Sequence, residues 1–149
     1  MSTSVTPFLW FEEGARDAAV FYTSIFDPDA AASVHDDGGP FMGTVQVAGQ
    51  DLILFEGGPH QAFNQAISLF VSVETQEEVD RLWDALSEGG APGRCGWLTD
   101  RFGVSWQIVP TALGQLMGSG DPERSNAVYE AMMTMGKLDI AGLQSAYDG

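Results

Sequence analysis

Apolar runs of strand length alternate with helical patterns along the first 110 residues of the chain. Such runs predict β-strands, and they occupy residues 5–11, 41–47, 52–55, 66–73, 95–98 and 104–109. Residues 15–26 and 76–90 instead repeat apolar side chains every three or four positions, which is the spacing of an amphipathic helix. Thr75 and Glu78 form a capping-box pattern at the start of the second predicted helix.

The order of strand, helix and further strands occurs twice, which indicates an internal repeat. A shift of 61 residues superposes the two halves and brings Pro7 onto Ser68. After Pro110 the repeat ends and two helical segments follow, the first opening at Asp121 and the second covering residues 138–147. We therefore predict an α+β fold with two modules and a helical tail, at about residues 4–57, 64–110 and 111–149.

The charge of the chain excludes some classes of partner. It has 6 basic and 21 acidic residues, a net charge of −15, and a pI near 4.1. A phosphate backbone or an anionic membrane needs clustered Lys and Arg, so we expect neither nucleic acid nor membrane as a partner. A single cysteine excludes a disulfide framework, and no signal-like or membrane-length apolar run is present, so we expect a cytoplasmic protein.

Several stretches resemble the vicinal oxygen chelate superfamily, the glyoxalase and bleomycin-resistance fold. Within it they are similar to the PhnB-like group, also described as demethylubiquinone-methyltransferase-like. The stretches are TPFLWFEEGARDAAVFYTSIF, GGPHQAFNQAIS, CGWLTDRFGVSWQIVP and, in the tail, PERSNAVYEAMMTMGKLDIAGL. The resemblance implies one domain over residues 1–149, in which two βαβββ modules form a curved, incompletely closed mixed sheet around a cavity for a small molecule. It also implies a homodimer, because partner chains often complete the cavities of this fold.

The metal ligands of the superfamily have poor counterparts here. The four ligand positions fall on Pro7, Ile53, Ser68 and Gln107, and these side chains do not form a divalent-metal site. The glycine pairs at 38–39, 57–58 and 89–90 do not lie between a strand and a helix, as the turn that holds a methyl donor would. We therefore expect no metal and no other cofactor.

Strand alternation predicts which side chains face the cavity. Taking the four ligand positions as the inner face places Leu9, Phe11, Phe55, Phe70, Ser72 and Ser105 beside them, with Phe8, Trp10, Val71, Val73 and Trp106 beneath the helices. This set suits a small neutral or hydrophobic ligand, or else simply fills the core. The predicted ligand contacts are Leu9, Phe11, Phe55, His60, Asn64, Ser68, Phe70, Ser105 and Gln107.

Three side chains are candidate catalysts. His60 lies in the middle loop, where it could act as a base or contact a ligand, or be an exposed loop residue whose neighbour Asn64 caps the local backbone. Cys95 is a nucleophile only if a base activates it, and otherwise a small buried side chain. Glu56 becomes a base if desolvated, but its place before two glycines favours exposure. The other histidine, His35, is expected to be solvated.

Two further features have ordinary structural explanations. We expect Asp100 to stabilise a hairpin turn and the neighbouring Arg101 to lie on the surface. Met132, Met133 and Met135 could form a soft recognition surface, although core or dimer packing is the commoner role of such residues.

Three functions remain open at this point. The first is a metal-free binding protein, a homodimer that sequesters or senses a small molecule. The second is an enzyme, of lyase, isomerase or transferase type, that uses His60, Glu56 or Cys95 without the usual metal. The third is a metalloenzyme with atypical ligands, for which His60 is the one plausible starting point. We favour them in that order.

Overall fold

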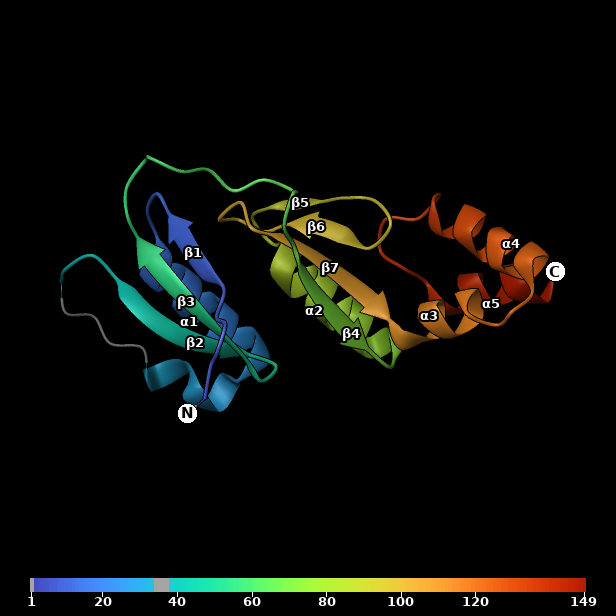
Figure 1. Ribbon diagram of the computed structural model, residues 1–149, viewed down its shortest axis with the longest axis horizontal. Coiled ribbons are helices and arrows are strands. Elements are labelled where there is room, and N and C mark those ends of the chain that lie inside the picture. Colours follow the sequence, from blue (N-terminus) through green and yellow to red (C-terminus); the bar gives the residue numbers. More distant parts are fainter. Residues whose placement is uncertain (1, 34–37) are drawn as a thin grey trace. The chain divides into compact units, whose positions relative to one another are not determined.

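The computed structural model describes residues 2–33 and 38–149, and the chain divides into two compact units, Met1–Phe63 and Asn64–Gly149. Each unit holds one sheet (Figure 1), so the predicted α+β class is confirmed. The expectation for His35 lies outside the described residues.

The first unit is a three-stranded sheet with one long helix. Strand β1 (Phe8–Phe11) lies parallel to β3 (Gln50–Glu56), and β3 pairs antiparallel with β2 (Met42–Val47), in the order β1-β3-β2. Helix α1 (Ala15–Phe26) and a 3-10 helix (Pro28–Ser33) come between β1 and β2. The described part of this module thus contains three strands, one fewer than in a complete βαβββ pattern.

Helix α1 approaches its sheet closely because small residues line its inner face. Ala15, Ala18 and Ala19 are fully buried, and Tyr22 beside them fills the remaining space. The connection between β2 and β3 is a two-residue turn at 48–49, where both φ angles are positive, at 50° and 84°. Turns of this kind match the twist of paired strands and favour glycine at the second position.

The second unit has the complete βαβββ order of the predicted module. It consists of β4 (Leu69–Val73), α2 (Gln76–Ser87), β5 (Ala91–Pro92), β6 (Trp97–Thr99) and β7 (Ser105–Pro110). Strand β4 is parallel to β7, and the other neighbours are antiparallel, in the order β4-β7-β6-β5. The predicted cap is present, since the Thr75 side chain accepts a hydrogen bond from the Glu78 backbone N–H.

The turn between β6 and β7 is built around a buried carboxylate. Asp100 is only 2% exposed. Its Oδ1 accepts hydrogen bonds from the backbone N–H groups of Phe102 and Val104, at 2.9 and 3.0 Å, and its Oδ2 accepts one from Trp106 Nε1 at 2.9 Å. The predicted turn role of Asp100 is confirmed. The bond to Trp106 ties this turn to the core of the second unit as well.

The tail contains three helices, not the two that were predicted. Helix α3 (Thr111–Met117) follows β7 directly, and α4 (Pro122–Met132) and α5 (Ile140–Asp148) come after it. We missed α3 because a helix of two turns shows too little periodicity to be distinguished from a loop. None of the helices in the described residues is long and apolar enough to cross a membrane.

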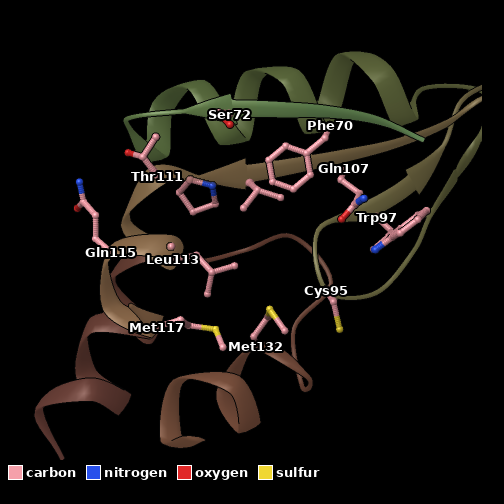
Figure 2. Close-up of a pocket in the computed structure, with 13 residues that line it drawn as sticks. Phe70, Ser72, Cys95, Trp97, Gln107, Thr111, Leu113, Gln115, Met117 and Met132 are labelled. Carbon is pink, nitrogen blue, oxygen red and sulfur yellow. The ribbon is translucent and has the colours of Figure 1, made fainter. Parts of the chain in front are cut away.

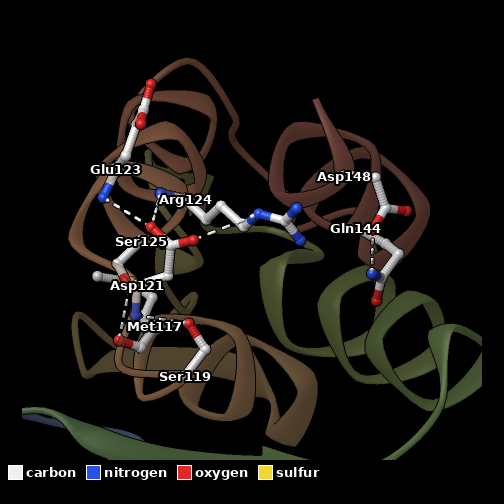
Figure 3. A network of polar contacts seen from close by, with 8 residues as sticks. All are labelled: Met117, Ser119, Asp121, Glu123, Arg124, Ser125, Gln144 and Asp148. Atoms are coloured by element: carbon white, nitrogen blue, oxygen red, sulfur yellow. Dashed lines mark hydrogen bonds and ion pairs between the residues drawn. The ribbon is translucent and has the colours of Figure 1, made fainter.

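A polar network orders the junction between α3 and α4 (Figure 3). The Asp121 carboxylate caps α4, because it accepts hydrogen bonds from the backbone N–H groups of Glu123 and Arg124 at 3.2 Å. The Ser125 hydroxyl donates to the carbonyl of Met117 at 2.9 Å and joins the start of α4 to the last turn of α3. The cap predicted at Asp121 is therefore confirmed.

The segment between α4 and α5 is held against the rest of the second unit at two places, the loop before β6 and the start of α2. Backbone N–H groups of Cys95 and Gly96 donate to the carbonyls of Met135 and Gly136, at 2.8 and 2.9 Å. On α2, the Gln76 amide donates to the carbonyl of Leu138 at 3.0 Å and accepts from the backbone N–H of Ile140 at 2.8 Å. These bonds satisfy tail backbone groups without a further strand.

An ion pair lies beside the Gln76 amide and generates a test of this attachment. Lys137 Nζ is 3.0 Å from Asp80 Oδ1. The hydrogen bond from Gln76, and then the bond from Lys137, hold the pKa of Asp80 below its usual value. Because the folded-state pKa is lowered, this stabilisation is present above the unfolded pKa, near about 4, and is lost as the pH falls through the folded value.

We expect Gln76→Leu and Lys137→Met each to raise the pKa of Asp80 towards its ordinary value, in an NMR titration of the side-chain carboxyl groups. Arg81→Met is the matched control on the same helix. It removes the partner that lowers the pKa of Glu78 and should leave Asp80 unchanged. An Asp80 titration that is the same in Gln76→Leu and the unaltered protein would contradict this account of the attachment.

Candidate ligand-binding pocket

A pocket of about 690 Å³ lies within the second unit, between the open face of its sheet and the first part of the tail (Figure 2). Its sheet side is made of Phe70, Ser72, Cys95, Trp97, Gln107, Val109 and Pro110. Its other side comes from α3 and α4, with Thr111, Leu113, Gly114, Gln115, Met117 and Met132. The volume is in the range of cavities that hold small organic molecules.

Strand register explains which side chains reach the pocket. Phe70 of β4 and Trp97 of β6 both lie opposite Gln107 of β7, so these three residues form one row across three strands. Side chains of paired residues project from the same face of a sheet. Trp106 and Ile108, the neighbours of Gln107 in the chain, therefore project to the other face, where both are fully buried.

The lining is mostly apolar and carries no carboxylate, imidazole, ammonium or guanidinium group. Aromatic, aliphatic and thioether side chains predominate, and the polar side-chain groups are two amides, two hydroxyls, the indole N–H of Trp97 and the thiol of Cys95. The Gln107 amide is oriented by a hydrogen bond from its Nε2 to the hydroxyl of Ser68, at 2.9 Å. Both residues belong to the predicted ligand-contact set, and Phe70 and Gln107 line the pocket. Ser105 is 3% exposed and does not line the pocket.

In the first unit, the predicted phase of β1 was wrong by one residue. Leu9 and Phe11, expected on the cavity face, are 8% and 1% exposed and belong to the buried face of this sheet. Trp10 lies in register with Phe55 on the parallel strand β3, so these two residues share the opposite face. Both faces of β1 carry large apolar residues, and the hydrophobic pattern therefore could not determine the phase.

The open face of the first sheet carries an aromatic cluster. The ring centroid of Phe55 is 5.0 Å from that of Trp10 and 5.6 Å from that of Phe8. The exposed side chain of His60 lies at the edge of this cluster, with its ring 6.4 Å from Trp10. Asn64 accepts a hydrogen bond from the backbone N–H of Ala66 at 2.8 Å. This local cap was part of the alternative in which His60 is an exposed loop residue.

The three candidate catalysts have different surroundings. Glu56 caps helix α1 from across the unit, since its Oε1 accepts from the backbone N–H groups of Gly14 and Ala15 at 2.8 and 3.3 Å. Cys95 lines the pocket, and its Sγ is 3.6 Å from the sulfur of Met133. Glu56 and His60 belong to the first unit and Cys95 to the second, and the second unit contains no histidine.

Two arrangements bear on metal and methyl-transfer chemistry in the described residues: a cluster of metal-ligating side chains and a glycine turn of the kind that typically holds a methyl donor. Ser68 and Gln107 bond to each other, and across residues 2–33 and 38–149 no three His, Cys, Asp or Glu side chains lie close enough to hold an ion. The glycine pair 57–58 follows β3 and precedes a loop, and the pair 89–90 lies between α2 and β5. Neither forms the strand-to-helix turn that typically holds a methyl donor.

Comparison with known proteins shows which family the chain belongs to. A family model described as 3-demethylubiquinone-9 3-methyltransferase matches residues 3–109. The chain belongs to this family. A PhnB protein from Bacillus cereus is 30% identical, with a TM-score of 0.61 over 72% of this chain and 99% of its own. Protein PA1353 from Pseudomonas aeruginosa, at 22% identity, has the same fold with a TM-score of 0.58 over 73% of this chain and 98% of its own. A search of curated proteins finds no match.

The family match ends before the tail begins. Residues 110–149 lie beyond the matched range, so the resemblance noted for the stretch from 122 to 143 is not part of this match. The same tail supplies Leu113, Met117 and Met132 to the pocket. The α3 residues were not among the predicted ligand contacts, because Leu113 and Met117, four positions apart, are a single apolar pair and do not distinguish a helix from a loop.

The bonds from Glu56 to the start of α1 predict that this residue contributes to stability as a helix cap. We expect Glu56→Ala to lower the free energy of unfolding by about 1 kcal/mol, as the loss of a helix cap typically does. Glu56→Gln keeps an oxygen acceptor and should lose much less. Urea unfolding followed by circular dichroism measures both. Equal destabilisation of the two variants would contradict the capping role.

Proposed function

We propose that this member of the family binds a small neutral or hydrophobic molecule in the pocket of its second unit, without a metal ion. The observation that carries the proposal is a lining without carboxylate, imidazole, ammonium or guanidinium groups, in which apolar side chains surround a few hydrogen-bonding groups. An ion entering such a site would lose its hydration without gaining a countercharge. We also propose that the chain is a single domain of the vicinal oxygen chelate type, acting in the cytoplasm to sequester or sense its ligand.

The family description names methyl transfer to a demethylubiquinone. The ring of such a quinone is neutral and planar, and those properties suit the pocket lining. Methyl transfer itself has less support, because the glycine turns do not have the form that typically holds a methyl donor. We therefore place ligand binding first and derive no methyl-transfer step.

Catalysis is the second candidate, on the observation that Cys95 lines the pocket. A thiol nucleophile needs a base or a positive charge to form the thiolate. The second unit has no histidine, and the guanidinium of Arg94 donates to the carbonyl of Met133. A lyase, isomerase or transferase reaction therefore has weaker support than binding. A metal site that includes His60 has still less support than catalysis by Cys95, because the described residues place no cluster of metal-ligating side chains around it.

The proposed homodimer is supported by the open aromatic face of the first unit. Phe8 is 48% exposed and Met42 is 63% exposed on this face. Exposed apolar surfaces of this kind commonly mark interfaces. A second copy of the chain is the partner that the family resemblance implies.

A matched pair of fluorescent probes tests the pocket. N-phenyl-1-naphthylamine is neutral, and 8-anilino-1-naphthalenesulfonate has the same aromatic frame with an added sulfonate. We expect the neutral probe to bind with enhanced fluorescence and the anionic probe to bind at least about ten-fold more weakly, because the lining offers no cation.

The same titration on Gly114→Leu tests where the probe binds. Gly114 lines the pocket, and a Cβ at this position would meet no atom within 4 Å, so a side chain can start from it without displacing a neighbour. We expect this variant to lose most of its affinity for the neutral probe, whereas Ala141→Leu on the exposed side of α5 keeps it. Unchanged binding to Gly114→Leu would place the probe elsewhere and contradict the proposal.

Sedimentation velocity tests the homodimer. We expect a species of about twice the 16.0 kDa chain mass, and a shift towards monomer in Phe8→Ser, which removes an exposed aromatic ring from the open sheet face. Val20→Ser is the control, because Val20 is 42% exposed on α1 and not on this face. A monomer at all protein concentrations would rule out the dimer.

A further inference from the structure

The row of Phe70, Gln107 and Trp97 across three strands places one amide between two aromatic rings at the pocket wall (Figure 2). Phe70 is 59% exposed, so the face of the pocket it helps to form is open to an incoming ring. Aromatic side chains make favourable offset or edge-to-face contacts with a further planar ring. The row therefore combines a surface for a flat ligand with a hydrogen-bonding group at its centre.

The amide of Gln107 has one end engaged by Ser68 and the other end available. Its Nε2 donates to Ser68 Oγ at 2.9 Å. The other end of the amide is Oε1, which only accepts hydrogen bonds. In the described part of the chain, no other protein group bonds to this amide. A ligand that covers Oε1 without donating to it leaves a desolvated acceptor unpaired, and that lowers its affinity.

We propose that the pocket selects planar aromatic ligands that carry an O–H or N–H donor at the ring edge, and that Gln107 Oε1 accepts from this donor. This inference rests on the proposed function and adds the class of ligand to it. Gln107 is the specificity-determining residue, and Ser68 is a positioning residue that acts through it. A site built around a hydrogen-bonding group discriminates more strongly than an apolar wall, because the wrong ligand leaves that group without a partner.

A phenol and its methyl ether test this selection. We choose 2-naphthol and 2-methoxynaphthalene, which share a planar ring system and are both uncharged at pH 7, and measure their binding by equilibrium dialysis. We expect the unaltered protein to bind 2-naphthol roughly three- to ten-fold more tightly than the ether, the range of one neutral hydrogen bond.

Variants of the two residues separate hydrogen bonding from shape. Gln107→Met keeps the length of the side chain and removes its polar atoms, so it should bind the two compounds nearly equally. Ser68→Ala keeps the acceptor but frees the amide to rotate, and should reduce the preference partly. Ser145→Ala removes an exposed hydroxyl on α5, outside the pocket lining, and should leave the preference unchanged.

The possible outcomes distinguish the two proposals. Failure of both compounds to bind the unaltered protein would contradict the proposed pocket function. Binding of both without preference, or an equal preference in Gln107→Met, would leave the pocket in place and overturn the selection of a donor. If Gln107→Met does not fold, the comparison of the two compounds on the unaltered protein and on Ser68→Ala still decides the question.

Discussion

The parallel pairing of β4 with β7 is the constraint on which the pocket depends. In this register Phe70 lies opposite Gln107 and Leu69 lies opposite Trp106. Successive side chains of a strand project to opposite faces. A slip of one residue would therefore turn the fully buried Trp106 into the pocket and the amide of Gln107 into the core, without a partner. The hydrogen bond from Trp106 to Asp100 opposes such a slip, because it anchors one strand to the turn that precedes it.

The tail converts the open face of this sheet into a pocket. Helix α3 begins directly after β7 and supplies Leu113 and Met117, and the later bonds to Gln76 and Cys95 hold the rest of the tail against the unit. The family match ends at residue 109, so the sheet side of the pocket, apart from Pro110, belongs to the matched region and the other side does not. In this chain, the lining depends on both.

The charge of the protein and the chemistry of its pocket are opposite in character. The chain carries a net charge of −15, and its ion pairs lie at exposed positions, such as the pairs of Glu78 with Arg81 and Asp121 with Arg124. The buried carboxylate of Asp100 has its hydrogen-bond donors in a turn and in the core, away from the pocket. The pocket lining contains no carboxylate, imidazole, ammonium or guanidinium group, and that neutrality favours binding of uncharged molecules over acid–base or metal chemistry.

Local patterns in the sequence were sufficient for the elements that depend on near neighbours. The helices α1 and α2, the Thr75 and Asp121 caps and the open face of the second sheet follow from periodicity and from residues three or four positions apart. Other features depend on groups that are distant in the chain. Glu56 caps a helix that begins 41 positions earlier, Gln76 binds the tail 62 positions later, and the phase of β1 is set by its pairing with β3. Spacing along a chain cannot show such contacts, because they form only when the strands and the tail have folded against one another. The sequence alone thus determined the class of fold and the neutral side chains of the second sheet, whereas tertiary structure decided which of them meet the tail to form a pocket.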